Sequence, residues 1–260
     1  MKKSFGSVVD GVIKKSDVVL EIVDARFLDE MINKGLEYYV KNRNKQLIIV
    51  VNKCDQVDDE ELAFLKKNHK DYVFISGTKK TGLNFLLQEI KKKALSVNAQ
   101  QIVGVLGYPN VGKSSIINSM KGRKSAGTSS EAGFTKGKQY LRIDPHIMMI
   151  DTPGVIPFAK RKEVDLVRIG AKNPGSIEDP EYAVIKILEL YPDAVENHYG
   201  VHFRFNKEKL IEEIAIKFNM KLKGNVPDTE RASRMILYDW QKGKIKKVRK
   251  EGSNSKKVVP

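Results

Sequence analysis

QIVGVLGYPNVGKSS, residues 101–115, joins a short apolar run to the pattern G-x-x-x-x-G-K-[ST]. The apolar run predicts a buried strand, and the residues after Lys113 have the apolar spacing of an amphipathic helix. Between strand and helix, glycines allow backbone N–H groups to fold around phosphate oxygens. We expect Lys113 to reach the outer phosphates and the Ser114 hydroxyl to bind Mg²⁺. The stretch therefore predicts an α/β domain that binds a nucleotide, with an ordinary Gly-rich turn as the alternative.

The chain on either side of this loop alternates short apolar runs with helical patterns. The expected strands are rich in β-branched residues and lie at 17–25, 46–52, 71–76, 101–107, 138–144 and 146–151. Helix-period apolar positions lie between them at 31–43, 58–69 and 82–95. This alternation predicts a mostly parallel sheet with helices on both faces.

Asn52-Lys53-Cys54-Asp55 ends the second expected strand and fits the pattern N-K-x-D. A carboxylate such as Asp55 accepts hydrogen bonds from the ring N–H and the amino group of guanine, whereas adenine presents an acceptor and leaves the charge unpaired. An unpaired desolvated group costs about 1–3 kcal/mol, and more when charged, so we expect a strong guanine preference. We expect Lys53 to lie along the base and ribose. Residues 76–78, Ser-Gly-Thr, resemble the S-A-K element that contacts the guanine oxygen, with a Ser-Gly turn as the alternative.

Residues 151–154, Asp-Thr-Pro-Gly, fit D-x-x-G after an expected strand. In this pattern the Asp holds Mg²⁺ through water and the Gly N–H meets the γ-phosphate; a simple turn is the alternative. Residues 121–139 are rich in Gly, Ser and Lys and lack periodicity, which predicts a mobile loop. Within that loop Thr135 is the candidate switch threonine over Mg²⁺ and the γ-phosphate. Its alternatives are Thr128, Ser129 and Ser130.

The motifs run in the order base motif, second base motif, phosphate loop, switch threonine and D-x-x-G, whereas the usual GTPase order begins with the phosphate loop. Over residues 5–245 this arrangement resembles the circularly permuted GTPases of the YlqF/RbgA and nucleostemin-like type. Asp24-Ala25-Arg26 resembles that family's D-A-R element, with a strand-end charge pair as the alternative. Residues 177–180 and 239–245 resemble further family segments. The resemblance implies a P-loop GTPase that hydrolyses GTP to GDP and phosphate as a switch in large ribosomal subunit assembly.

The motifs and the resemblance together imply a site for GTP or GDP with Mg²⁺. Asn110 matches the asparagine that related GTPases use to hold K⁺, with stabilisation of the turn as the alternative. The expected catalytic groups are Lys113, Thr135 and Gly154, and the expected magnesium ligands are Ser114, Thr135 and Asp151. The expected nucleotide-binding residues are Asn52, Lys53, Asp55, Ser76, Gly77, Thr78, Pro109, Asn110, Val111, Gly112, Lys113, Ser114, Ser115, Thr135, Asp151 and Gly154.

Val155 stands after D-x-x-G, where many small GTPases place a water-orienting Gln, and its side chain cannot form a hydrogen bond. Catalysis then needs another group, an ion or a residue or nucleotide from a partner. We therefore expect slow intrinsic turnover that the ribosome and K⁺ stimulate. Some YlqF-type members carry an N-terminal histidine proposed to act in hydrolysis, but the first histidine here is His69, on an expected exposed helix. His146, His198 and His202 lack metal-ligand spacing and are expected to be structural or at the surface.

The α/β pattern gives way to helices after a Pro-Gly pair at 174–175. The helices are expected at 180–190, 193–199, 206–219 and 228–243, with Asn206 and Asp228 as N-caps. We expect a GTPase domain over 1–174, a small all-α domain over 175–243 and a disordered basic tail over 244–260.

Lys and Arg number 47 against 32 Asp and Glu, a net charge of +15. This surplus favours a polyanionic partner, with nucleic acid ahead of an anionic membrane. Basic clusters lie at 121–124, 158–168, 217–223 and 242–250, although a solvated helix face is the alternative for any one of them. With the resemblance, they predict binding to rRNA within the large subunit or its precursor.

The remaining composition bears on where the chain acts. The single cysteine, Cys54, offers no intramolecular disulfide, and no apolar run reaches the length of a membrane span. We expect a cytoplasmic, monomeric protein without membrane association. A non-catalytic, GTP-dependent RNA-binding scaffold is the alternative function, and Asp55 argues against a P-loop ATPase or small-molecule kinase.

Overall fold

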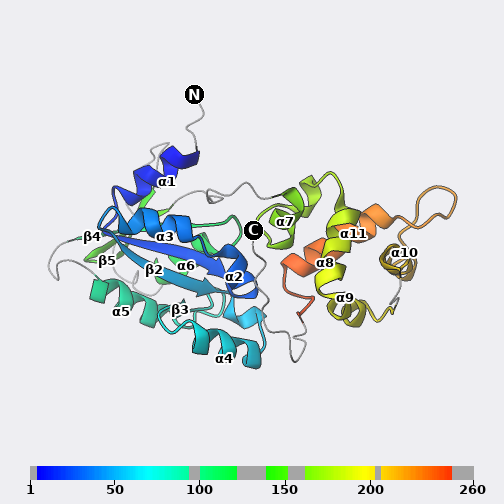
Figure 1. Ribbon diagram of the computed structural model, residues 1–260, viewed down its shortest axis with the longest axis horizontal. Coiled ribbons are helices and arrows are strands. Elements are labelled where there is room, and N and C mark those ends of the chain that lie inside the picture. The colour runs from blue at the N-terminus through cyan, green and yellow to red at the C-terminus, as the bar shows by residue number, and fades with distance from the viewer. Residues whose placement is uncertain (1–4, 94–99, 122–138, 152–161, 203–205, 248–260) are drawn as a thin grey trace. The chain divides into compact units, whose positions relative to one another are not determined.

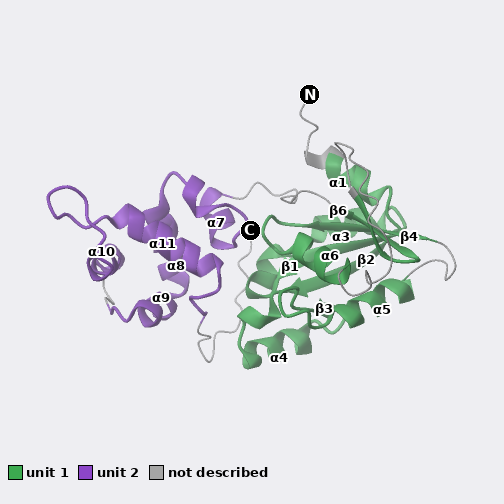
Figure 2. Cartoon of the chain, turned by 180° about the vertical axis from the view of Figure 1, so that it is seen from behind, with its two compact units in different colours: residues 1–160 green, residues 161–260 purple. Residues whose placement is uncertain are grey.

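The computed structural model describes residues 5–93, 100–121, 139–151, 162–202 and 206–247 (Figure 1). The chain divides into two compact units, residues 1–160 and 161–260 (Figure 2). The sequence placed this boundary at 174, but α7 (Glu163–Arg168) groups with the second unit because it packs on α8 (Pro180–Leu190) and α11 (Thr229–Gln241). Among the described residues, no helix combines the length and apolar character needed to cross a membrane.

The first unit is built on a six-stranded sheet with the order β3-β2-β1-β4-β6-β5. Its strands are β1 (Val18–Asp24), β2 (Gln46–Asn52), β3 (Val73–Phe74), β4 (Gln101–Gly107), β5 (Gln139–Asp144) and β6 (Ile147–Asp151). Neighbouring strands are parallel except for β5 and β6, which are antiparallel. The predicted α/β class with a mostly parallel sheet is confirmed.

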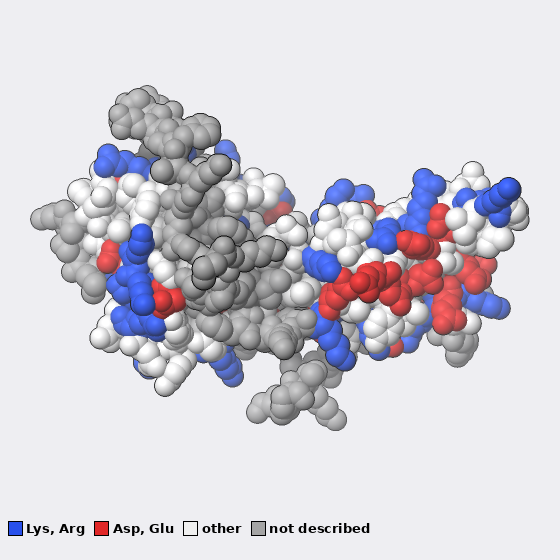
Figure 3. Space-filling model, turned by 90° about the horizontal axis from the view of Figure 1, so that it is seen from above, with Lys and Arg blue, Asp and Glu red and all other residues white. Residues whose placement is uncertain are grey.

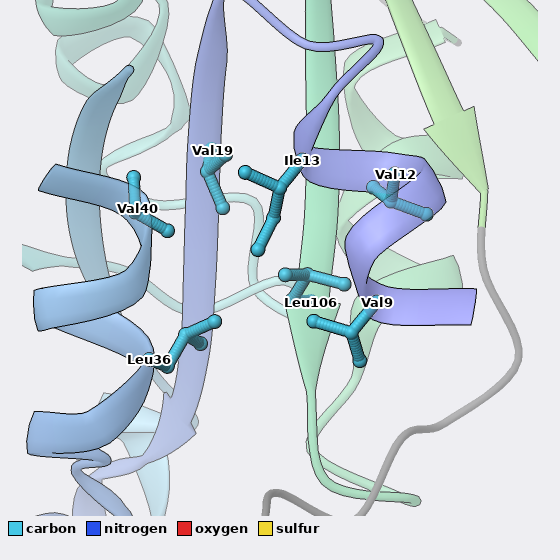
Figure 4. Packing of buried hydrophobic residues seen from close by; sticks show 7 residues of the cluster. All are labelled: Val9, Val12, Ile13, Val19, Leu36, Val40 and Leu106. Atoms are coloured by element: carbon cyan, nitrogen blue, oxygen red, sulfur yellow. The ribbon is translucent and has the colours of Figure 1, made fainter. Parts of the chain in front are cut away.

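Helices cover both faces of this sheet. They are α1 (Phe5–Ile13), α2 (Leu28–Met31), α3 (Lys34–Lys41), α4 (Asp59–Asn68), α5 (Leu83–Lys93) and α6 (Lys113–Lys121). In Figure 1, α1 and α3 lie on one face and α5 on the other. Figure 4 shows the first of these faces, where side chains of α1 and α3 meet those of β1 and β4. The cluster consists of Val9, Val12, Ile13, Val19, Leu36, Val40 and Leu106.

Gly104 permits this close packing of α1 on β4. A Cβ atom at Gly104 would lie 2.3 Å from Ser16 Oγ and 2.8 Å from Val12 Cγ1. Since heavy atoms do not approach so closely, any side chain at this position would push α1 away from the sheet.

Two local predictions were wrong in detail. The helix expected over 31–43 begins later, at Lys34 in α3, because Ile32 ends α2 in an extended conformation and the Asn33 side chain accepts a hydrogen bond from Leu36 N (3.1 Å), which caps the new helix. The strand expected over 71–76 is only two residues long in β3. Beyond it Ser76 pairs with Thr81 in an isolated bridge.

The second unit is helical, with α9 (Pro192–Tyr199) and α10 (Lys207–Lys217) beside α7, α8 and α11. Its predicted N-caps are confirmed: Asn206 Oδ1 accepts from Lys209 N (3.0 Å), and Asp228 Oδ1 accepts from Arg231 N (2.9 Å). Trp240 lies in the core at 2% exposure, and its Nε1 donates to the Arg168 carbonyl at 2.7 Å. This bond ties the last turn of α11 to the end of α7.

Candidate nucleotide-binding site

The carboxyl ends of β1, β2 and β4 lie together at one edge of the sheet. Asp24 is paired in register with Asn52, and Ile22 with Gly107. Since these strands are parallel, the loops that follow them start at the same edge. This arrangement brings the N-K-x-D motif beside the phosphate loop although the two are far apart in the chain.

The phosphate loop is wrapped around its lysine. Lys113 Nζ donates to the carbonyls of Gly107 (3.1 Å) and Tyr108 (2.7 Å) and is 6% exposed. Asn110 (φ 62°) and Gly112 (φ 95°) turn the backbone through left-handed conformations. Ser114 and Ser115 are exposed at the N-terminus of α6. A helix N-terminus with unpaired N–H groups favours an anion, so this is where phosphates would be held.

Asn52 connects the two halves of the site. Its Nδ2 donates to the Val111 carbonyl (2.8 Å), and its Oδ1 accepts from Gly77 N (2.9 Å), so one buried amide holds both the phosphate loop and the second base element. A Cβ at Gly112 would lie 2.4 Å from Asn52 Nδ2, which explains the glycine there. Ser119 Oγ, on α6, adds a bond to the Gly77 carbonyl (2.9 Å).

Asp55 is oriented by a serine from the next base element. Ser76 Oγ donates to Asp55 Oδ1 (2.5 Å) and in turn accepts from Lys79 N (3.0 Å). Oδ2 of the half-buried Asp55 has no hydrogen-bond partner among the residues that the structure describes. The carboxylate is thus held in place through one oxygen, and its other oxygen can accept hydrogen bonds from a ligand.

Lys53 joins an ion-pair cluster at the end of β1. Its Nζ lies 2.9 Å from Asp24 Oδ2, and Arg26 NH2 lies 2.7 Å from the same oxygen. Burial alone would raise the pKa of Asp24, but the hydrogen bonds and charges of Arg26 and Lys53 outweigh it and hold that pKa at about 2. The strand-end charge pair considered for D-A-R therefore forms, and it extends to the base motif.

Cys54 shows no sign of reactivity. Its thiol donates to the Val51 carbonyl (3.3 Å), and burial raises its pKa to about 11. A thiol with such a pKa stays protonated near neutral pH and is a poor nucleophile or metal ligand.

The expected magnesium ligands are only partly described. Ser114 is the last residue of the phosphate loop, and the backbone of Asp151 ends β6, whose neighbour in the sheet is β4. Serine hydroxyls and aspartate carboxylates offer oxygen ligands of the kind that Mg²⁺ prefers. Thr135 and its alternatives, the Asp151 side chain, Gly154 and Val155 lie outside the described part of the chain.

The other predicted site residues occupy the same edge. Thr78 and Asn110 are exposed, Pro109 is half-buried, and Val111 and Ser76 are buried. Three polar contacts were not predicted from the sequence. They are the hydrogen bond from the Ser76 hydroxyl to Asp55, the hydrogen bond from the Ser119 hydroxyl to the Gly77 carbonyl, and the ion pair of Asp24 with Lys53. Nothing in the sequence marks Ser119 as a site residue, because a serine on the second turn of a helix belongs to none of the motifs.

The histidines take structural or surface positions, with His146, His198 and His202 exposed. His69 ends α4 and stacks on Tyr72 with ring centroids 4.8 Å apart, so it is less exposed than expected. His198 lies 3.9 Å from Asp239, and His202 3.3 Å from Glu196. Within the described ranges, no three His, Cys, Asp or Glu side chains gather as a metal site.

The chain resembles known GTP-binding proteins in sequence. Residues 102–194 match the family described as "50S ribosome-binding GTPase". The chain is 35% identical to a GTP-binding protein of Methanocaldococcus jannaschii, over 92% of this chain and 65% of the relative. It is 36% identical to nucleolar GTP-binding protein 2 of Yarrowia lipolytica, over 90% of this chain and 48% of the relative. The chain thus spans about half to two-thirds of the length of these curated relatives.

Solved structures show the same fold. GNP-bound YlqF from T. maritima superposes with a TM-score of 0.65 at 26% identity, covering 92% of this chain and 94% of YlqF. The GDP-bound form gives 0.66 at 25% identity.

Sheet order, shared strand edge and motif order together define a P-loop GTPase domain that is circularly permuted, because its guanine motif precedes its phosphate loop. Within this class the chain is similar in fold to YlqF and similar in sequence to GTP-binding proteins that include nucleolar GTP-binding protein 2.

Proposed function

We propose that this protein hydrolyses GTP to GDP and phosphate as a switch in the assembly of the large ribosomal subunit. The observation that carries the nucleotide assignment is the held Asp55 carboxylate, which Ser76 orients toward a guanine while Asn52 fixes the phosphate loop beside it. Support for the ribosomal role comes from the match to a family described as 50S ribosome-binding. The proposal includes a monomeric, cytoplasmic protein.

Each predicted site residue takes a specific role in this proposal. Asp55, Lys53 and residues 76–78 bind the base, and residues 109–115 with Lys113 bind the phosphates. Ser114, Asp151 and Thr135 would hold Mg²⁺, which neutralises charge on the β- and γ-phosphates when bound. Thr135 and the Gly154 N–H would meet the γ-phosphate, and Asn110 would hold K⁺. Because Val155 cannot orient a water molecule, a ribosomal group or K⁺ would complete the site.

The partner in this proposal is rRNA within the large subunit or its precursor, and the charge distribution supports particular parts of the chain as the contact region. Residues 161–241, the helical body, carry 13 Lys and Arg against 14 Asp and Glu. Figure 3 accordingly shows an acidic band on the helical unit. Residues 242–260 carry eight against one, and residues 1–160 carry 26 against 17. The helical body is therefore not basic, contrary to the expectation from sequence. In this proposal the rRNA is contacted by the basic segment after α11 and by the GTPase unit.

The proposal is tested by GTP turnover with and without purified large subunits, in K⁺ and in Na⁺. We expect slow hydrolysis by the free protein and faster hydrolysis with subunits and K⁺. A Lys113→Ala variant controls for contaminating GTPases. Turnover that large subunits do not stimulate would count against the switch role.

The base assignment has its own test. Replacing Asp55 by Asn should weaken GTP binding and move preference toward xanthosine nucleotides, because the amide can donate to the xanthine oxygen. Unchanged GTP affinity would show that Asp55 does not read the base.

A non-catalytic, GTP-dependent RNA-binding scaffold is the second candidate, and Val155 is the observation that favours it. Such a scaffold would bind large subunits in a GTP-dependent way without turnover under any of these conditions. Co-sedimentation with ribosomal particles in each nucleotide state, combined with the turnover assay, separates the two functions.

A further inference from the structure

The carboxylate of Asp24 is fully engaged by two cations. It lies at the end of β1 at 1% exposure. Oδ1 accepts from Arg26 Nε (3.0 Å) and Arg26 N (3.0 Å), and Oδ2 accepts from Arg26 NH2 (2.7 Å). Lys53 Nζ takes the remaining position on Oδ2 at 2.9 Å. Arg26 thus fixes the plane of the carboxylate, and Lys53 is bound to an acceptor that cannot rotate.

Lys53 is also fixed through its backbone. It has a left-handed conformation (φ 64°, ψ 33°), which is unfavourable for a residue with a side chain. Its carbonyl accepts from Gln56 N (2.9 Å), and its neighbours are held by the Asn52 amide bonds and by Cys54 N on the Ile75 carbonyl (3.2 Å). With both ends held, the lysine stem between them has few conformations left.

We propose that Asp24 is a positioning residue for guanine-nucleotide binding, which holds the Lys53 ammonium so that the lysine stem is ordered along the base and ribose before the nucleotide arrives. The inference rests on the proposed base site. A free lysine has many rotamers, and ordering them during binding lowers affinity, so a preformed ion pair removes that cost. The Asp55 carboxylate reads the base edge, whereas Asp24 acts through Lys53 on the base plane and ribose.

A double-mutant cycle on the dissociation constant of GDP tests this role. The four proteins are the wild type, Asp24→Asn, Lys53→Met and the double variant, each titrated with fluorescent GDP. We expect Asp24→Asn to raise the dissociation constant about tenfold in the wild type and less than about twofold in the Lys53→Met background, since the partner through which it acts is gone. An equal factor in both backgrounds, or no effect in either, would overturn the proposal.

The ratio of the GDP and IDP affinities gives a second readout, because a substitution that loosens the base-binding loop would change this ratio. Because the lysine stem contacts the base plane, Asp24→Asn should weaken GDP and IDP by the same factor. The Asp55→Asn variant should change the ratio of the two affinities, since IDP lacks the amino group. A changed ratio in Asp24→Asn would mean that the substitution disturbs Asp55, and would overturn a role confined to Lys53.

Asp144→Asn is the matched control. Asp144 is also a buried strand-end carboxylate, with Lys91 Nζ at 3.1 Å and His146 N at 3.2 Å, but it lies at the opposite edge of the sheet. We expect it to leave the GDP dissociation constant within about twofold of the wild type, a change below the tenfold effect assigned to Asp24. A loss equal to that of Asp24→Asn would mean that any buried carboxylate change weakens binding, against the proposal.

Lys53→Arg keeps the question testable if Asp24→Asn does not fold. Arginine can retain the ion pair with Asp24, so we expect Lys53→Arg to bind GDP more tightly than Lys53→Met. Equal affinities would contradict the need for the pair. A wild type that binds no guanine nucleotide would refute the proposed base site itself, an outcome separate from failure of the cycle.

Discussion

Glu21 is a carboxyl buried in the middle of β1, at 1% exposure. Its Oε1 accepts from Asn33 N at 3.1 Å, and its Oε2 has no hydrogen-bond partner within the described residues. Burial raises its pKa from 4.5 to about 8, with the nearby charge of Glu37 adding to the effect. Because the folded-state pKa is the higher one, the stability from the neutral carboxyl is fully present below about pH 4.5 and is lost as pH rises through about 8.

Glu21→Gln should therefore gain stability over the wild type as pH rises from 5 to 8. The side chain keeps its shape and its acceptor for Asn33 N but no longer ionises. The difference in free energy of unfolding should grow by at most about 1.4 kcal/mol per pH unit. Urea unfolding at four pH values measures it, with the exposed Glu60→Gln as control. A difference that does not depend on pH would show that Glu21 is not the titrating group.

Single residues also show how far the sequence could predict this site. Asn52 and Asp55 were predicted because a short motif fixes their residue types and the strand before them fixes their place. The contact of Asp24 with Lys53 was not, since it depends on two strand ends lying side by side, which only the sheet order determines. The N-caps Asn206 and Asp228 were predicted because the capping bond is local, spanning three residues.

Among the elements, the last turn of α11 shows what the sequence D-W-Q-K-G, residues 239–243, does in the helical unit: its side chains bond to the end of α7 and to the segment after it. Beside the Trp240 bond to Arg168, Gln241 Nε2 donates to the carbonyls of Val167 (2.7 Å) and Lys172 (2.8 Å). These donors pair with the Val167 and Arg168 carbonyls at the end of α7, a helix of only six residues, and with the Lys172 carbonyl in the segment that follows it. The segment found by resemblance thus has a structural role.

Gln241→Ala should lower the free energy of unfolding of the helical unit by about 1–2 kcal/mol, because the Val167 and Lys172 carbonyls each lose one hydrogen bond. Trp240 is the only tryptophan in the chain, so its fluorescence during urea unfolding reports on this unit. The control is Lys242→Ala, at the neighbouring exposed position, which should change stability by less than about 0.5 kcal/mol. Equal losses in the two variants would mean that the Gln241 bonds contribute nothing specific.

At the scale of the whole molecule, charge is distributed unevenly along the chain. Replacing Arg249, Lys250, Lys256 and Lys257 by Gln should weaken binding to large subunits and reduce the slope of log affinity against log salt by up to about 3.6, because each phosphate contact contributes about 0.7–0.9. The control replaces four exposed lysines of the helical body, Lys207, Lys209, Lys221 and Lys223. Binding measured over a range of KCl concentrations should change less for the control. A larger change in the control would place the RNA contact on the helical body.

The sequence predicts two units, but its boundary at residue 174 differs from that of the structure by one helix, α7. A Pro-Gly pair at 174–175 gave the expected boundary, but the structure groups residues from 161 onward because α7 packs on α8 and α11. Such packing depends on contacts between residues about 70 positions apart, as in Gln241 with Val167, and no local signal reports it.

The sheet order also determines what a growing polypeptide contains at each stage of its synthesis. Once β3 and the turn after it have left the ribosome, β1, β2 and β3 can pair, and both elements of the proposed base site are complete. The β1 edge that later receives β4 is then still unpaired, and no phosphate loop exists to let a nucleotide stabilise the partial sheet. An unpaired edge of this kind invites wrong strand pairing. Translation of residues 75–107 is therefore the interval in which a nascent chain with this motif order would depend most on chaperones.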